Sequence, residues 1–433
     1  MLYAGVLFFL MLQYLRPQEF IILIRGVRLV LITMIMLLPP WLATLQLKKV
    51  LRTPEDLFMF LFWIICIVSY WNHWKSQMYV PLQAVGKTLL CYLLVAHVID
   101  TRRKLAGVVW LAMLMLLIVA FTAGHGAGGT KTHYASFIPM FDNRNDFAYA
   151  MAIMLPIAFA FVLRGDVFAK IVGAGVMLVG ISQLIPSDSR GGQLASIFAV
   201  YTIFFIQAKS KLGKQIMLIA GVLVLMAAFA VSARLATVGG YKQDKSAMGR
   251  VEVWAKGLEM FREKPFIGKG YFSWRDHAKR DSHSSYMRAI GELGGIGLFI
   301  YIGLLFYALR DTYQIAMRAT TRTLRVCAMG MTGVMVGHII GSLFQTRLYH
   351  SFILVQIAVI SGMRLVADRE GVLTQPTPAA GPPEPPPPGP WQLSQGAGFM
   401  SRGLVNRKDL MKIGALTFGC WLLHKVFVMY SFR

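Results

Sequence analysis

Apolar runs of spanning length recur along most of the chain and are separated by short polar connections. A run of about 20 apolar residues is long enough to cross the hydrocarbon core of a bilayer as a helix. The pattern predicts an all-α, polytopic helical membrane protein with about 12 transmembrane helices. The expected spans are 1–15, 27–46, 56–72, 78–99, 105–123, 146–163, 168–185, 193–208, 214–231, 286–309, 325–344 and 349–366.

One long polar segment interrupts this pattern at about 232–285, between the ninth and tenth predicted spans. Part of it has apolar residues at helical spacing, which predicts an amphipathic helix that begins near Arg250. These apolar residues are Val251, Trp254, Leu258 and Phe261. Such a helix would lie on the membrane surface or cap a cavity.

The C-terminal part departs from the pattern of spans. Residues 374–398 are rich in Pro, Gly and Gln, which predicts an extended linker that does not pack. A second apolar stretch, 413–430, is interrupted by His424 and Lys425, and it fits either a further span or an interfacial helix. We therefore expect a membrane domain at 1–366, a Pro-rich cytoplasmic linker at 367–410 and an apolar C-terminal segment at 411–433.

The charge of the chain fits a membrane protein better than a nucleic-acid-binding protein. Only 15% of the residues are charged, against about 25% in soluble proteins, and the net charge is +24. Much of the basic charge lies in connections between spans, so topology and anionic lipid account for it. A cytoplasmic N-terminus puts the more basic short connections inside and the 232–285 loop outside the cytoplasm. Met1–Leu15 lacks a basic flank and a cleavage site, which favours a first span over a signal peptide.

The four cysteines, Cys66, Cys91, Cys327 and Cys420, all lie in apolar runs without metal-ligand spacing. We expect free, buried thiols and no disulfide framework. The chain also lacks the phosphate-binding glycine loop and the metal motifs of nucleotide- and metal-dependent enzymes. No metal and no cofactor are therefore expected.

The residues before the span at 193–208 suit an anion. Ser187 to Gly192 read Ser-Asp-Ser-Arg-Gly-Gly, which offers N-cap side chains and free backbone N–H groups at a helix start. Arg190 adds a bidentate donor for phosphate, so a diphosphate site is one interpretation. The alternative is an arginine that snorkels from a helix end. Arg250 is a second candidate phosphate ligand, and its alternative is a solvated loop charge.

His283 is the candidate general base. Asp281 and Ser282 resemble N-cap residues, which would put His283 in the first turn of the next span, where the helix dipole favours a neutral imidazole. Helical spacing then puts Gly294 and Gly297 beneath it on the same face, as a groove for a lipid tail or another helix. Glu292 falls on the opposite face, so we expect it to be a structural partner rather than a catalytic group.

Other candidates rest on weaker patterns. Asn143 and Arg144 end the outer connection at 123–145, where they would bind a glycan or cap the next helix. Arg347 stands in a short outer turn and is a further candidate for substrate binding. Trp254 and Trp274 would serve as sugar platforms or as membrane-interface anchors, and the pattern favours anchors.

Three motifs resemble one known superfamily. Arg190-Gly-Gly-Gln-Leu194 fits the arginine-x3-leucine motif of the O-antigen ligases. His283-Ser284, followed after nine residues by Gly294-x-x-Gly297, fits their histidine motif at full spacing, and Gly249-Arg250-x3-Trp254 is similar to the arginine segment of their large periplasmic loop. The resemblance covers about 1–366 and extends to the O-antigen ligases, the Wzy-type polysaccharide polymerases and the bacterial O-oligosaccharyltransferases.

The resemblance implies a metal-independent glycosyltransferase of the bacterial inner membrane. Its donor would be a glycan on undecaprenyl diphosphate, held by Arg190 and Arg250, and His283 would deprotonate an acceptor hydroxyl on the periplasmic face. The acceptor stays open between lipid A-core, a growing polysaccharide and a protein, and the other expected contact is membrane lipid, not nucleic acid. The alternative is a transporter or flippase for polyprenyl-linked glycan, which would show an internal repeat or charged, broken helices near the midplane.

Overall fold

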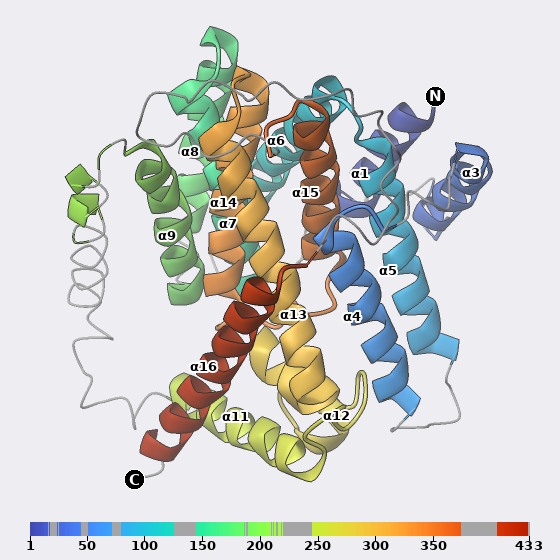
Figure 1. Cartoon of the computed structure of the whole chain (residues 1–433), viewed down its shortest axis with the longest axis vertical. Coiled ribbons are helices and arrows are strands. Elements are labelled where there is room, and N and C mark those ends of the chain that lie inside the picture. Colours follow the sequence, from blue (N-terminus) through green and yellow to red (C-terminus); the bar gives the residue numbers. More distant parts are fainter. Residues whose placement is uncertain are drawn as a thin grey trace, which may run out of the picture.

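The computed structural model describes residues 1–15, 17, 24, 26–44, 51–71, 79–124, 144–185, 187, 189–208, 210, 212–213, 215–217, 219, 245–373 and 405–431. All regular elements in this part of the chain are helices (Figure 1). They are α1 (Leu2–Leu15), α3 (Leu29–Thr44), α4 (Pro54–Trp71), α5 (Tyr79–Val98), α6 (Arg102–Gly124), α7 (Arg144–Arg164), α8 (Val167–Leu184), α9 (Arg190–Gln207), α11 (Lys245–Glu263), α12 (Trp274–His277), α13 (Ser285–Arg318), α14 (Arg322–Gly341), α15 (Ser351–Arg369) and α16 (Arg407–Ser431).

The helices follow the apolar runs closely. Each predicted span coincides with a helix except 214–231, which lies largely outside the described residues. Within the described ranges, six helices have the length and composition to cross a membrane, and four shorter ones are also apolar. The chain is therefore a multi-pass membrane protein, although twelve spans remain a prediction.

The tightest part of the bundle is the contact of α7, α9 and α14. Small residues of α14 allow this approach, because a Cβ on Gly333 would meet Pro156 of α7 and the backbone of Ala199 on α9. Close approach of small residues is a common way to pack helices in a bilayer, where dispersion rather than the hydrophobic effect drives association. The α13 helix packs beside this group, on α14 and α4, and α15 packs on α5.

The polar segment forms a separate layer across one end of the bundle, where α11 and α12 lie below α13 in Figure 1. The amphipathic helix predicted here is confirmed, although it begins at Lys245 rather than near Arg250. Val251 and Leu258 are buried and Phe261 is half-buried. This face packs on α13 and α16, so α11 covers the bundle end.

The α13 helix is broken at Gly294, where φ is 71° and ψ is −167°. The backbone groups freed by the break bond to the turn after α11: Gly295 N donates to Pro265 O at 2.7 Å and Ile296 N donates to Phe266 O at 3.2 Å. Paired backbone groups are required for a buried helix to break without a large penalty. The break leaves an outer piece at 285–293 and an inner piece at 295–318.

The groove predicted at Gly294 and Gly297 is wrong. A Cβ on Gly294 would collide with the carbonyl of Phe266, and a Cβ on Gly297 would collide with the side chain of Leu293. Both positions are therefore filled by the protein itself. The prediction failed because it counted 3.6 residues per turn through Gly294, and the chain leaves the helix there.

The apolar C-terminal stretch forms α16, which runs diagonally along α13 and reaches α11 with its last turns (Figure 1). Near its start, Asp409 Oδ2 accepts from Arg310 Nη1 of α13 at 2.7 Å. Its buried residues recur at helical spacing, and its opposite face exposes large apolar side chains, as a helix facing lipid does. The buried residues with described side chains are Asp409, Ile413, His424 and Val428.

The prediction of free cysteines is confirmed. None of the four, all of which lie in the described part of the chain, forms a disulfide. Cys66, Cys91 and Cys327 are buried, and Cys420 on α16 is half-buried. The Pro-rich linker between α15 and α16 falls on residues outside the described ranges.

Candidate functional site

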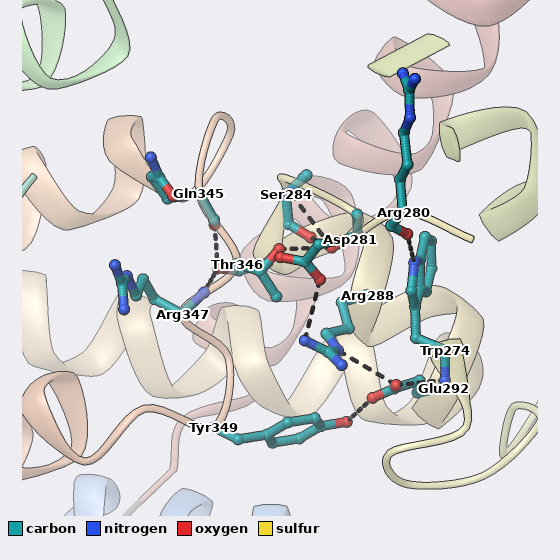
Figure 2. A network of polar contacts seen from close by, with 12 residues as sticks. Trp274, Arg280, Asp281, Ser284, Arg288, Glu292, Gln345, Thr346, Arg347 and Tyr349 are labelled. Carbon is teal, nitrogen blue, oxygen red and sulfur yellow. Dashed lines mark hydrogen bonds and ion pairs between the residues drawn. The ribbon is translucent and has the colours of Figure 1, made fainter. Parts of the chain in front are cut away.

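The turn at 342–350, between α14 and α15, is the point at which the candidate segments meet. It holds the start of α13 by three hydrogen bonds: Ser285 N donates to Ser342 O at 2.9 Å, Ser285 Oγ donates to Gln345 O at 2.9 Å, and Arg347 N donates to Ser285 Oγ at 2.8 Å. Figure 2 shows Gln345, Thr346 and Arg347 of this turn beside the acidic network described below. Ser285 is fully buried, so these bonds are made out of reach of solvent.

His283 lies before α13 and not in its first turn, which corrects the prediction. The N-cap is Ser284, whose Oγ accepts from Met287 N at 3.3 Å, and the helix begins at Ser285. The backbone of His283 is left-handed, with φ of 48°. A non-glycine residue in this region is strained by about 1–3 kcal/mol, and such strain collects at functional sites.

The two serines around His283 hold this turn. Ser282 Oγ donates to Ser284 O at 3.0 Å and lies 2.7 Å from Thr346 Oγ1 of the 342–350 turn. Ser284 takes the extended backbone that an N-cap requires, and His283 lies at the bend before it. The sequence alone did not reveal which of the three polar residues before the helix would be the cap.

Arg190 is the first residue of α9, as expected for an anion site at a helix start. Ser189 is the N-cap, and its Oγ accepts from Gly192 N at 3.4 Å. A Cβ on Gly191 would meet the ring of Phe344, so the start of α9 contacts the 342–350 turn. The side chain of Arg190 lies outside the described atoms, and its role in binding stays a prediction.

Arg250 lies on α11, one turn before a tryptophan that joins this helix to the His283 turn. Trp254 Nε1 donates to Ser282 O at 2.9 Å, and the indole is 8% exposed. Next to Arg250, Gly249 leaves room for the guanidinium of Arg280, whose Nη1 would lie 2.6 Å from a Cβ there. Trp254 is therefore a buried link, not a membrane-interface anchor, and Arg250 itself is half-buried.

Arg347 is 8% exposed, and its Cζ lies 5.6 Å from the centroid of the Tyr149 ring on α7. A cation over an aromatic face is stabilised, more so when desolvated. The Tyr149 hydroxyl bonds His338 Nδ1, and His338 Nε2 lies 3.1 Å from the Tyr301 hydroxyl. This buried polar chain links α7, α14 and α13 directly beneath the 342–350 turn.

Glu292 joins the outer piece of α13 to the surrounding loops (Figure 2). Its Oε1 accepts from Trp274 N at 2.8 Å and from Arg288 Nε at 3.2 Å, and its Oε2 accepts from Tyr349 Oη at 2.7 Å. The side chain is fully buried. The predicted structural role of Glu292 is confirmed by these three bonds.

The residues that bond Glu292 are themselves fixed by burial and by further bonds. Burial raises the pKa of Tyr349 well above its usual value, and the charge of Glu292 acts in the same direction, so the phenol stays a hydrogen-bond donor. Trp274 is fully buried and donates from Nε1 to Arg280 O at 3.0 Å, so its predicted role as an interface anchor is wrong. Arg288 also pairs with Asp281, at 3.3 Å.

The predicted substrate-binding roles of Asn143 and Arg144 stay predictions. Asn143 lies outside the described residues, and Arg144 opens α7 with a side chain that is not described. Sequence reasoning missed Arg288, Tyr349 and His338. The spacing of Arg288 and Glu292, four residues apart on a helix, was a usable signal. Tyr349 and His338 join residues far apart in the sequence, so no local pattern marks them.

Comparison with known proteins gives three findings. Residues 174–302 match the family model of the O-antigen ligases, Wzy_C, and this range contains Arg190, Arg250 and His283. The exopolysaccharide production protein ExoQ of Rhizobium meliloti (strain 1021) is 24% identical over 297 residues, which cover 62% of this chain and 68% of the relative. A chain from a solved structure described as "Structural coordination of polymerization and crosslinking by a peptidoglycan synthase complex" is 16% identical, with a TM-score of 0.45, and the alignment covers 73% of this chain and 97% of that one.

Proposed function

Because this chain belongs to the O-antigen ligase and Wzy-type superfamily, we propose that it transfers an oligo- or polysaccharide from undecaprenyl diphosphate to an acceptor hydroxyl. The reaction takes place on the periplasmic face of the bacterial inner membrane. The family supports the coarser statement, a membrane enzyme that ligates or polymerises polysaccharide, and the residues described above support the donor and the roles that follow.

His283 accepts the proton of the acceptor hydroxyl while the hydroxyl oxygen bonds to the anomeric carbon of the donor glycan. The bond between that carbon and the phosphate oxygen breaks, and undecaprenyl diphosphate leaves with the electron pair. Attack from the face opposite the leaving group inverts the anomeric carbon. Arg190 and Arg250 bind the diphosphate and stabilise the charge that develops on it.

The observation that carries this proposal is the meeting of three segments around the 342–350 turn. The start of α9 contacts it through Gly191, the His283 turn bonds it through Ser282, and α11 bonds the His283 turn through Trp254. These segments hold the two proposed diphosphate ligands and the proposed base. The positive end of the helix dipole at the start of α9 adds to the attraction for a phosphate.

Reconstitution of the purified protein in liposomes with a lipid-linked glycan and an acceptor tests the proposal. Wild-type protein should form the linked product and release undecaprenyl diphosphate. His283→Ala should lower the turnover rate by at least about 100-fold, because a general base contributes about 100- to 10,000-fold.

The diphosphate ligands have a matched control on α11. Arg190→Ala and Arg250→Ala should each abolish most transfer, whereas Arg262→Ala, which removes an exposed arginine of α11, should not change it. Transfer by His283→Ala at the wild-type rate would refute the proposed base. Movement of the donor across the bilayer without any linked product would favour a flippase instead.

A further inference from the structure

We infer that His424 of the C-terminal helix α16 is a positioning residue for His283 and acts on it through Trp254. The inference rests on the proposed function for the role of His283, but the contacts themselves do not depend on it. The helix lies outside 174–302, the range that matches the family, so the family does not account for it.

The imidazole of His424 lies against the indole that holds the His283 turn. The two ring centroids are 5.0 Å apart with the planes at 60°. The imidazole also contacts the ring of Tyr286 on α13, with 6.4 Å between the centroids. Trp254 Nε1 donates to the carbonyl of Ser282, the residue next to His283. A shift of the indole would therefore move that turn through one hydrogen bond. Tilted aromatic contacts of this kind are specific in geometry as well as apolar.

The orientation of the His424 ring is fixed by its own helix. Its Nδ1 donates to Cys420 O at 2.8 Å, which fixes the ring on its own helix. Its Nε2 is buried and has no hydrogen-bond partner among the described residues. The contact that reaches Trp254 is therefore made by the face and edge of the ring and not by a hydrogen bond from Nε2.

His424 does not touch substrate in this arrangement, because its side chain is 1% exposed. Its effect must therefore pass through a neighbour, and Trp254 is the neighbour that leads to the proposed base. A second contact from the same helix supports α11 about two turns further along, where the rings of Trp421 and Phe261 lie 6.5 Å apart.

The other end of α16 is anchored, which makes the helix a rigid support. Asp409 is buried and accepts from Arg310 Nη1, and Arg310 also lies 4.4 Å from the centroid of the Tyr307 ring. With α13 held at this end and α11 at the other, α16 connects the inner piece of α13 to the layer that covers the bundle end. The position of Trp254 is then set by contacts at both ends of one helix.

The test compares three variants of the full chain in liposomes. His424→Ala removes the ring and should lower kcat about tenfold while the KM for the lipid-linked donor stays within twofold of wild type. His424→Phe keeps an aromatic ring without the nitrogens and should restore most of kcat. Leu423→Ala changes a neighbouring side chain that is 61% exposed on the lipid-facing side, and it should leave both constants unchanged.

A second measurement reports the contact independently of activity. The protein is labelled with 5-fluorotryptophan, and the ¹⁹F resonance of Trp254 is assigned from its absence in Trp254→Phe. His424→Ala should shift this resonance, because the ring current of the imidazole is removed, and Leu423→Ala should not. Thermal unfolding of each variant shows whether it is folded.

The outcomes separate the two proposals. If wild-type protein forms no linked product, the proposed function fails, while a shifted resonance still supports the contact of His424 with Trp254. If wild-type protein is active and His424→Ala keeps the wild-type kcat, the positioning role is refuted even with a shifted resonance. Failure of His424→Phe to restore kcat in a folded protein would refute the aromatic contact as its cause.

Discussion

Gly294→Ala gives the sharpest test of the broken helix. The φ of 71° and ψ of −167° at Gly294 fall in a region that is essentially open to glycine alone. Strain of a side-chain-bearing residue there costs about 1–3 kcal/mol. The added methyl group would also collide with the Phe266 carbonyl, and movement away would break one or both hydrogen bonds from Gly295 and Ile296, at about 0.5–1.5 kcal/mol each. We expect a loss of about 1.5–6 kcal/mol in the free energy of unfolding.

The buried thiols provide the assay. Cys66, Cys91 and Cys327 are free and buried, so a thiol-reactive fluorescent dye reports their exposure as the detergent-solubilised protein is heated. Gly175→Ala is the matched control, because a Cβ at Gly175 on α8 meets nothing within 4 Å. Alanine is also the better helix former by about 1 kcal/mol, so this control should be neutral or stabilising.

The expected result is a lower unfolding midpoint for Gly294→Ala together with reduced glycan transfer. The transfer should fall because the outer piece of α13 carries the turn of His283 and the Glu292 network. If Gly294→Ala unfolds at the same temperature as Gly175→Ala, the break does not require glycine, and the reasoning about this joint is refuted.

Two further predictions concern buried charge. Glu292→Gln removes the acidic partner of Arg288, and because breaking a buried pair costs about 3–5 kcal/mol, the unfolding midpoint in the thiol assay should fall; an unchanged midpoint would show that Glu292 is not the link between these loops. Asp311→Asn removes the carboxylate that pairs with Arg310 of α13 and Arg364 of α15, and it should destabilise the protein by a similar amount. Arg310 also holds Asp409 of α16, so a protease should cleave the variant near Arg407 faster than it cleaves the wild-type protein. Equal cleavage rates would contradict a role for Arg310 in holding α16.

Elements governed by local sequence were predicted well. The spans follow from runs of apolar residues, because a bilayer forces each run to pair its backbone groups within one helix. The amphipathic α11 followed from the spacing of Val251, Trp254 and Leu258, which is a local pattern. The structural role of Glu292 is confirmed by its bonds, although the helix face from which it was predicted was counted from His283, which lies before the helix.

Apart from Arg288, whose partner lies one turn away on the same helix, the failures involve contacts between distant segments. Gly294 breaks α13 because the turn at 264–268 supplies hydrogen-bond acceptors for the freed backbone N–H groups. The sequence around Gly294 contains no signal that this turn lies beside it. His283 moved out of the helix because Ser284, held next to Ser282 and Thr346, became the N-cap. Tyr349 was missed for the same reason, since its partner Glu292 lies on another helix.

The left-handed backbone of His283 has a consequence for protein design. The angle of this residue is imposed by Ser282 and Ser284 together with Thr346 on a separate turn. Grafting a histidine alone onto the start of a helix in another scaffold would reproduce the residue but not its orientation. A transplant would need the 282–285 turn together with the 342–350 turn and Trp254 of α11, so a designer would have to copy three segments to move one side chain.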